Sequence, residues 1–322
     1  MIRYLRRIQA VIPDWVRFFL RRVLAAVPIG VIVTLGVFAL VFAMPGDPLR
    51  ELAGDKPIPA AVLAAKRAQY HLDDPFIVQY LLSMKDILTG HFGTTFAGGD
   101  IADQLRLRIP VTLKLTLLAN AVQWTLGLFF GIYAGFKRNG LIDRSLLLAT
   151  LVLLAVPGLV AYFAAQYLFG VQLKWFPVSG VLEGFPRAYL LPALVIGVLG
   201  FAGLARLLRT SIVETVNADF VKTARAKGLG EQRVLWRHIL PNALLPVITF
   251  IGIDLAGMFG GAIITESIFN LPGLGQFMFQ AIKLKEGGVV VLLSTLAFIS
   301  FIVINLLVDL LYGVLDPRVR NG

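Results

Sequence analysis

Long uncharged stretches alternate with shorter charged ones along this chain. About 20 helical residues cross the roughly 30 Å of hydrocarbon in a bilayer, and six stretches are close to that length or longer. They lack the alternation of barrel strands, so helices are the expected spanning form, because backbone polar groups in lipid must be satisfied within the segment. The predicted spans are 23–44, 115–136, 145–173, 188–205, 239–266 and 287–308.

Prolines and glycines inside these spans predict how the helices bend and pack. The prolines that predict kinks, which a helical bundle tolerates, are Pro28, Pro157, Pro192 and Pro246. Glycines recur every four residues at Gly127, Gly131 and Gly135. Because this spacing allows helices to approach closely, we expect these glycines to build helix contacts.

Charged residues between the spans predict how the chain crosses the membrane. The first 22 residues hold six arginines against one acid, and such a basic excess marks cytoplasmic segments. Residues 137–144, which follow the second span, have the same excess. Because six spans place both ends of a chain on the same side, both termini are predicted to be cytoplasmic. The predicted segments are a cytoplasmic N-terminal segment 1–22, a transmembrane helix 23–44, an extracytoplasmic segment 45–110, a five-helix core 111–314 with a cytoplasmic loop 206–240, and a cytoplasmic tail 315–322.

Composition supports a membrane protein and excludes several functional classes. Of the 322 residues 57% are hydrophobic and 15% charged, which is too apolar for a soluble domain of this size. The net charge of +11 suits attraction to anionic lipid. The basic residues are spread over four segments, which does not favour nucleic-acid binding. Cysteine, a histidine cluster and a Gly-Lys phosphate loop are all missing, so the sequence predicts no catalytic residue, no metal site and no nucleotide site of its own.

The cytoplasmic loop contains the mixed-charge stretch "DFVKTARAKGLGEQRVLWRHILPN", residues 219–242. Asp219 is predicted to be the N-cap of a helix over 220–227, and Gly228 suits the left-handed residue that ends it. At about 12 Å, such a helix is too short to span a membrane. Its function must therefore lie at the cytoplasmic surface.

The faces of this short helix leave two interpretations. Phe220 and Ala224, four residues apart, share one face, while Lys222, Arg225 and Lys227 point elsewhere. In one interpretation the charges form a solvated loop that only fixes topology. In the other, the aromatic and small face seats in a groove of another protein.

This loop resembles the one before the penultimate helix in permease subunits of binding-protein-dependent ABC importers. Their motif is Glu-Ala-Ala, three residues, Gly, nine residues, Ile, one residue and Leu-Pro. The residues that match it here are Ala224, Gly228, Leu240 and Pro241. The residues that depart from it are Lys222, Thr223 and His238. The stretch "DFVKTARAKGL" resembles the version found in the dipeptide and oligopeptide branch of the family.

Resemblance to that branch extends along nearly the whole chain. The landmarks, in the expected order, are "PGDP" at 45–48, "GHFGTTF" at 90–96, "LPALVIG" at 191–197, "ESIFNLPGLG" at 266–275 and "LVDLLYGVLDPRVR" at 307–320. The resemblance implies an all-α polytopic membrane protein with six transmembrane helices and the ABC importer type I permease fold. It also implies a permease of the bacterial plasma membrane that imports di- or oligopeptides, or nickel or another small solute.

For the cytoplasmic loop, the resemblance implies a coupling helix that docks on an ATP-binding subunit. Phe220 and Ala224 are expected to be buried in that partner, and Lys222 and Arg225 to pair with its acidic groups. The expected coupling residues are Asp219, Phe220, Lys222, Thr223, Ala224, Arg225, Lys227, Gly228, Leu240 and Pro241.

The assembly that the resemblance implies contains a second, related permease, two ATP-binding subunits and an extracytoplasmic substrate-binding protein. ATP and Mg are expected on the ATP-binding subunits, and no cofactor on this chain. Segment 45–110 is expected to form short helices over 60–70 and 75–88 that receive the binding protein, with "GHFGTTF" as a turn. The alternatives from other classes are a secondary transporter driven by an ion gradient and a noncatalytic membrane scaffold.

Asp254 lies about halfway along the fifth predicted span, where a charge is costly unless it faces water or a partner. It either lines the substrate pathway and meets a cationic group, or is held between helices as a protonated or hydrogen-bonded side chain. Gly260 and Gly261 are candidates for exposing backbone along the same pathway. Glu266, near the end of this span, is expected to be structural.

The docking hypothesis predicts that Asp219→Pro and Phe220→Asp each uncouple transport from ATP hydrolysis while the permease stays inserted in the membrane. Normal transport by both variants in an uptake assay would contradict it.

Overall fold

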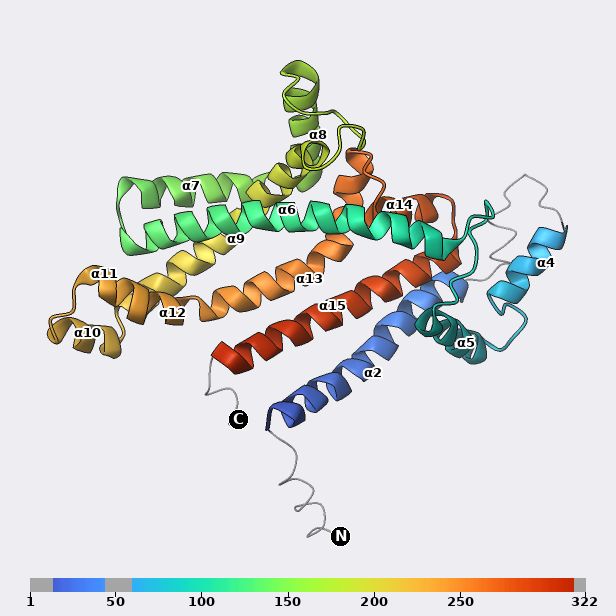
Figure 1. The fold of residues 1–322 in the computed structure, drawn as a ribbon, viewed down its shortest axis with the longest axis horizontal. Coiled ribbons are helices and arrows are strands. Elements are labelled where there is room, and N and C mark those ends of the chain that lie inside the picture. The colour runs from blue at the N-terminus through green and yellow to red at the C-terminus, as the bar shows by residue number, and fades with distance from the viewer. Residues whose placement is uncertain (1–13, 44–59, 316–322) are drawn as a thin grey trace, which may run out of the picture. The chain divides into compact units, whose positions relative to one another are not determined.

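The computed structural model describes the backbone of residues 14–43 and 60–315. It describes the surroundings of the side chains for residues 22–43, 61–257 and 262–308. The described residues are mainly helical, and Thr94 and Asp100 form an isolated bridge (Figure 1). They make two compact units, one from residues up to Arg108 together with those from Phe277 onward, the other from Ile109–Gln276. The all-α fold is confirmed.

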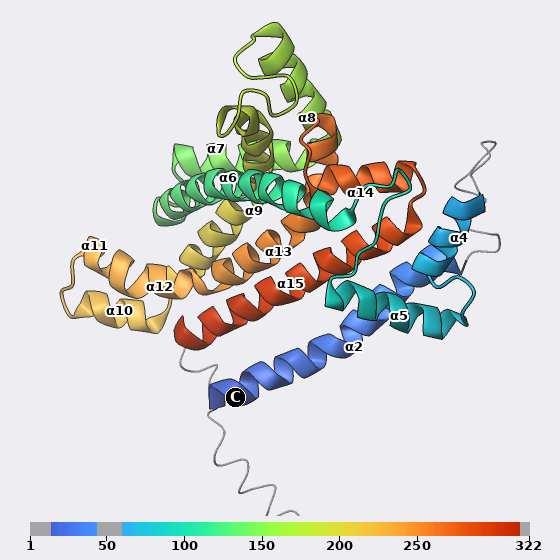
Figure 2. The same ribbon diagram turned by 45° about the vertical axis from the view of Figure 1, so that its right-hand side comes forward.

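Helices from both ends of the chain build the first unit. The long apolar helices α2 (Asp14–Phe42) and α15 (Gly287–Leu315) run side by side in both ribbon views (Figures 1 and 2). The two short helices predicted before the second span are present as α4 (Ala60–Gln69) and α5 (Phe76–Thr89), each within one residue of the expected ends. This unit also contains the start of α6 (Ile101–Phe136) and most of α14 (Leu274–Lys283), a helix that was not expected.

Aromatic packing holds α5 against the two long helices. Phe38 of α2 is fully buried beside Tyr80 of α5 and Val291 of α15. The rings of Phe38 and Tyr80 meet edge to face, with their centroids 5.6 Å apart. The Tyr80 hydroxyl also hydrogen-bonds the Thr34 hydroxyl at 2.8 Å, so the polar end of the buried ring is satisfied.

The second unit contains the remaining helices and the rest of α6. Long helices in it alternate with short ones, and two segments have π-helical geometry. Its further elements are α7 (Leu141–Ala155), α8 (Gly158–Ala165), η1 (Gln166–Gln172), α9 (Arg187–Val216), α10 (Asp219–Ala226), α11 (Glu231–Val234), η2 (Leu235–Ile239), α12 (Leu240–Ala243) and α13 (Leu245–Ile268).

Four helices of the described residues are long and apolar enough to cross a membrane by themselves. Two further pairs of helices qualify only if each bent pair counts as one span, which gives the predicted total of six. The pair Leu141–Ala155 and Gly158–Gln172 bends by 96°, and the pair Glu231–Ala243 and Leu245–Gly257 bends by 47°. The first bend falls at Pro157, where a kink was predicted, because proline cannot continue the hydrogen-bonding pattern of the preceding helix.

Two predicted boundaries lie inside helices. Asp100 caps α6, since its carboxylate accepts hydrogen bonds from the backbone N–H groups of Ala102 at 2.7 Å and Asp103 at 3.2 Å. The helix therefore starts before the predicted end of segment 45–110. Likewise α9 continues to Val216, so the first part of the predicted loop 206–240 is helical.

A seam of glycines lets α6 lie directly against α9. A Cβ atom on Gly127 would come within 2.5 Å of the Leu204 side chain, and one on Gly135 within 2.8 Å of Ile212 Cβ. A Cβ on Gly131 would lie 3.0 Å from the backbone oxygen of Ala205. The prediction that these glycines build a helix contact is confirmed.

The landmark "ESIFNLPGLG" is a packing motif around a buried carboxylate. Glu266 is fully buried and accepts hydrogen bonds from the Thr112 hydroxyl at 2.6 Å and the Gln276 backbone N–H at 3.0 Å. A Cβ on Gly273 would lie 2.4 Å from that carboxylate, and one on Gly275 would lie 2.6 Å from the backbone of Ile263. Side chains at these two positions would thus push the loop off α13, and the structural role expected for Glu266 is confirmed.

We expect Gly135→Ala to destabilise the protein by about 1–3 kcal/mol, the usual cost of overpacking. The new methyl group would meet the stiff, branched side chain of Ile212. Thermal unfolding in detergent measures the effect.

Gly36→Ala is the matched control, because a Cβ on Gly36 of α2 would meet nothing within 4 Å. Alanine should be neutral or slightly stabilising there, since it favours helix more than glycine does. Equal losses of stability in both variants would contradict the seam.

Candidate functional site

Residues 219–243 fold into a helical elbow, formed by α10, α11, η2 and α12 (Figure 1). Gly228 has φ +78°, the left-handed conformation predicted for the end of α10. Its backbone N–H donates to the Arg225 carbonyl at 2.9 Å, which closes the turn. Pro241 lies in the first turn of α12, where a proline was expected.

The buried face of α10 differs from the predicted one. Val221 is fully buried, Ala224 is 5% exposed, and both pack within the chain's own core against Val234 and Ile239. This chain itself therefore covers the side chain of Ala224, and its assignment as a coupling residue stays a prediction. The sequence signal for this inward orientation of Ala224 is Val221, an apolar residue three positions earlier in a stretch rich in charged residues.

The outward face of α10 keeps Phe220, whose side chain is 46% exposed. An exposed phenylalanine on a short polar helix is available to a partner, so the prediction of contact through this ring stands. Thr223 and Lys227 are exposed beside it. The face offered by α10 therefore centres on Phe220 and lacks Ala224.

The charged residues of α10 already have partners in the elbow. Lys222 Nζ donates to Asp219 at 2.9 Å, and Arg225 makes two hydrogen bonds with Glu231 at 2.8 and 2.9 Å. The hydrogen bond from Lys222 holds the pKa of Asp219 below its usual range. Because exposed ion pairs contribute little to stability, acidic groups of a docked protein could replace these partners at small cost.

Asp219 is the first residue of α10 and not its N-cap. The cap is Ala218, which has extended backbone angles and no capping side-chain hydrogen bond. Proline is well tolerated at the first helical position, so Asp219→Pro would not break the helix and does not test docking. Phe220→Asp remains a valid test.

The elbow shares its core with two long helices of the same unit. Leu240 of α12 and Val247 of α13 are buried in the cluster that holds Val221. Leu208 and Ile212 of α9 belong to the same cluster, and both also pack against the glycine seam of α6. A continuous set of contacts therefore connects α10, through α11, η2 and α12, with α9 and α13.

Asp254 of α13 lines a cavity of about 510 Å³ within the second unit. Its Oδ2 accepts a 2.7 Å hydrogen bond from Gln123 Nε2 of α6. The carboxylate is thus hydrogen-bonded between helices and also borders a cavity, and its place on the substrate pathway stays a prediction. Gly260 and Gly261 lie farther along α13, but their surroundings fall outside the described residues, so their role stays a prediction.

Sequence reasoning missed a buried ion pair between α7 and α9. Asp143, 2% exposed, accepts two hydrogen bonds from Arg209, through Nε and, at 2.8 Å, through Nη2. The backbone N–H of Asn139 donates to the same carboxylate at 2.9 Å. The sequence places both residues in predicted cytoplasmic segments, and because they are 66 positions apart no local pattern reveals the pairing.

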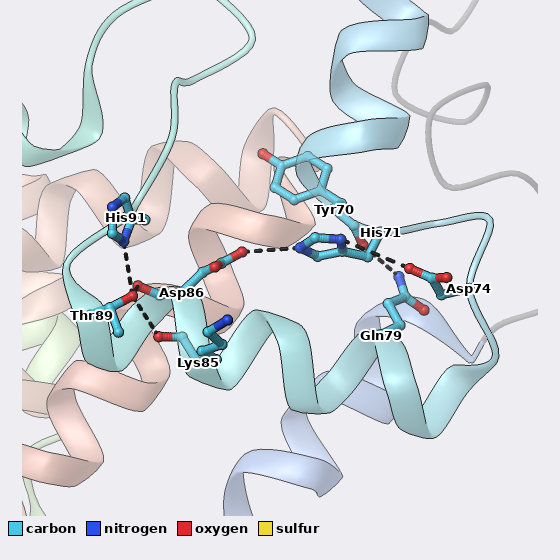
Figure 3. A network of polar contacts seen from close by, with 8 residues as sticks. All are labelled: Tyr70, His71, Asp74, Gln79, Lys85, Asp86, Thr89 and His91. Carbon is cyan, nitrogen blue, oxygen red and sulfur yellow. Dashed lines mark hydrogen bonds and ion pairs between the residues drawn. The ribbon is translucent and has the colours of Figure 1, made fainter.

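The segment that contains α4 and α5 is held together by polar contacts (Figure 3). His71 Nε2 lies 3.0 Å from Asp86 Oδ2, and the Gln79 amide donates to the Tyr70 carbonyl at 3.0 Å. Thr89 contacts His91 at 2.9 Å. These contacts fasten the turn after α4 to α5. The stretch "GHFGTTF" has the turn geometry that was expected, with positive φ at both of its glycines.

A buried lysine closes this segment on its other side. Lys66 is 4% exposed, donates to Thr94 Oγ1 at 2.9 Å and lies over the Phe96 ring. Glu286, also buried, accepts a hydrogen bond from the Phe96 backbone N–H at 3.3 Å. Burial lowers the pKa of Lys66 and raises the pKa of Glu286. The segment is therefore a packed cap with a fixed surface.

The apolar helices, the bent pairs and the packed elbow define a multi-pass membrane protein. The family model described as "Binding-protein-dependent transport system inner membrane component" matches residues 127–321, and the model for the N-terminal part of such membrane components matches residues 15–116. The chain belongs to this family, the inner-membrane permease subunits of binding-protein-dependent ABC importers.

Curated relatives match almost end to end. The probable peptide ABC transporter permease protein y4tP of Sinorhizobium fredii is 34% identical over 310 residues, covering 94% of this chain and 99% of the relative. The dipeptide transport system permease protein DppB of Alkalihalophilus pseudofirmus is 30% identical over 330 residues, with 94% and 99% covered. The glutathione transport system permease protein GsiC of Pectobacterium atrosepticum is 34% identical over 304 residues, with 94% and 98% covered.

Solved structures support the type I fold. The MetNI methionine ABC transporter in an inward-facing conformation matches with a TM-score of 0.53 at 18% identity, covering 67% of this chain and 98% of that one. An amino acid ABC transporter solved with histidines matches with a TM-score of 0.52, also at 18% identity, covering 66% of this chain and 94% of that one. The match to the family model and the names of the curated relatives do not favour the alternative of a secondary transporter driven by an ion gradient.

We expect Asp143→Ala to destabilise the protein by about 3–5 kcal/mol, because it leaves Arg209 buried without its carboxylate. Adding Arg209→Leu should restore part of the loss. Asp103→Ala, which removes an exposed partner of Arg106, is the control and should cost about 1 kcal/mol or less. Thermal unfolding in detergent compares them, and equal effects of the two aspartate variants would refute a buried clamp.

Proposed function

We propose that this chain forms half of the translocation pathway of an ATP-driven importer of di- or oligopeptides. Relatives that match nearly the whole chain carry peptide, dipeptide and glutathione transport in their names, and glutathione is itself a short peptide. These names do not favour the alternative that the same architecture imports nickel or another small solute. This chain carries out no covalent chemistry in the proposal.

The observation that carries the coupling mechanism is the elbow that packs into the bundle while leaving Phe220 exposed. We place the contact with an ATP-binding subunit on the outward face of α10. Binding of ATP and Mg by that partner favours one of two bundle conformations, because the nucleotide-loaded partner binds them with different affinity. The shared core then carries movement of α10 to α9 and α13.

The remaining partners follow from the same proposal. A second, related permease completes the pathway, two ATP-binding subunits sit on the cytoplasmic side, and an extracytoplasmic binding protein delivers the peptide. The segment with α4 and α5 receives the binding protein, and its buried Lys66 and paired His71 support a surface that keeps its shape. Both termini lie in the cytoplasm of the bacterial cell.

The test reconstitutes the chain with its partner subunits in liposomes and measures uptake of a labelled dipeptide together with ATP hydrolysis stimulated by the loaded binding protein. Phe220→Asp should reduce both by at least about tenfold, as expected for a central interface residue. The half-exposed position of Phe220 means that the variant should still fold and insert.

Phe220→Leu is the matched control, since it keeps an apolar contact and should retain most of the coupling. Wild-type activity in Phe220→Asp would refute docking through α10. Absence of dipeptide uptake by the wild-type assembly would refute the peptide cargo and leave the coupling test valid, because ATP hydrolysis is measured separately.

A further inference from the structure

The cavity beside Asp254 combines an apolar wall with a small group of hydrogen-bond acceptors. It lies entirely within the second unit, between α6, α8, α9 and α13. Leu115, Tyr162, Ile196 and Ile253 contribute to the apolar wall. The polar side chains in the lining are Thr116, Gln123 and Asp254.

Two of these polar side chains are buried with an unused acceptor. Gln123 is 1% exposed, and its Oε1 has no hydrogen-bond partner within the described part of the chain. Thr116 is 3% exposed, and its Oγ1 is likewise without a partner there. Threonine in a helix commonly bonds the carbonyl one turn earlier, so a buried free hydroxyl needs another explanation.

The orientation of the Gln123 amide fixes which atoms remain. Its NH₂ group faces Asp254 Oδ2 at 2.7 Å, and for an ionised Asp254 the reverse orientation would bring two acceptor oxygens together. The Gln123 oxygen lies against Gly200 of α9, where a Cβ would come within 2.2 Å of it. A side chain at position 200 would displace the amide, so Gly200 keeps Gln123 in this position.

The polar side chains around the cavity provide a carboxylate, an amide oxygen and a threonine hydroxyl, and the last two are covered by neighbouring atoms. All three accept hydrogen bonds, while the donors among the lining residues are the second N–H of the Gln123 amide and the hydroxyls of Thr116 and Tyr162. A carboxylate ligand would be repelled by an ionised Asp254. An ammonium group carries three donors and a positive charge, and it is attracted to the face of an aromatic ring such as Tyr162. Metal ions such as Ca²⁺ need six to eight oxygen ligands, more than this lining supplies.

We propose that this cavity is a transit subsite for the ammonium group of a passing peptide, with Asp254 as counter-charge and Gln123 and Thr116 as hydrogen-bond acceptors. The inference rests on the proposed function and adds the chemical group that the pathway recognises. The competing explanation is that the Gln123–Asp254 hydrogen bond only joins α6 to α13.

The experiment measures binding directly in the assembled importer, embedded in nanodiscs without its binding protein. The probes are alanyl-alanine, which has a free ammonium group, and N-acetyl-alanyl-alanine, which lacks it. Ligand-observed saturation-transfer NMR detects the weak binding expected of a transit site. Asp254→Asn removes the charge while keeping the size of the side chain, and Thr116→Val removes the free hydroxyl.

We expect wild-type protein to bind alanyl-alanine at least about tenfold more tightly than the acetylated probe, the loss that accompanies an unpaired buried charge. Asp254→Asn should abolish this preference, and Thr116→Val should weaken it. Thr295→Val is the matched control, because Thr295 of α15 is also buried with an unpartnered hydroxyl but does not line the cavity. It should bind as wild type does.

Equal binding of both probes by wild-type protein, or an unchanged preference in Asp254→Asn, would overturn the subsite. Thr116→Val provides a second test if Asp254→Asn fails to fold, because valine has the shape of threonine and should leave the fold unchanged. Dipeptide uptake by the wild-type importer is measured on the same preparation with binding protein added. Uptake without an ammonium preference refutes the subsite alone, whereas absence of uptake refutes the proposed function.

Discussion

The close contact between α6 and α9 is the constraint on which the second unit depends. It exists because three glycines on α6 leave room for Leu204, Leu208 and Ile212 on α9. All three are at the same time part of the buried cluster that holds Val221 and Ala224 of the elbow. Without the seam, α9 would stand away from α6, and the buried cluster that α9 shares with the elbow would be disrupted.

Three carboxylates in the second unit differ in their burial and in their hydrogen bonds. Asp143 and Glu266 are buried, and both oxygens of each accept hydrogen bonds from the protein. They serve as clamps, because breaking such a site leaves polar groups stranded in an apolar environment. Asp254 receives one hydrogen bond and borders an open cavity. The difference separates a structural acid from one that is available to a ligand.

Much of the fold could be predicted because local patterns determine it. Uncharged stretches gave the spans, and the four-residue spacing of glycines gave the seam. The orientation of α10 could not be predicted, since Ala224 turns inward only because Val234 and Ile239 provide a core for it. Pairing of Asp143 with Arg209 depends on how α7 meets α9, and the acceptors around Asp254 come from α6, which is far from α13 in the sequence. Such contacts follow from tertiary packing.

The 96° bend at Pro157 has a consequence for the surrounding lipid. Two arms at nearly a right angle cannot both follow the membrane normal, so α7 spans the bilayer by itself if it is the arm that follows the normal. Its 15 residues reach about 22 Å, which is less than the roughly 30 Å of hydrocarbon in a typical bilayer. The resulting hydrophobic mismatch must be relieved by local thinning of the bilayer or by a neighbouring subunit that shields this flank.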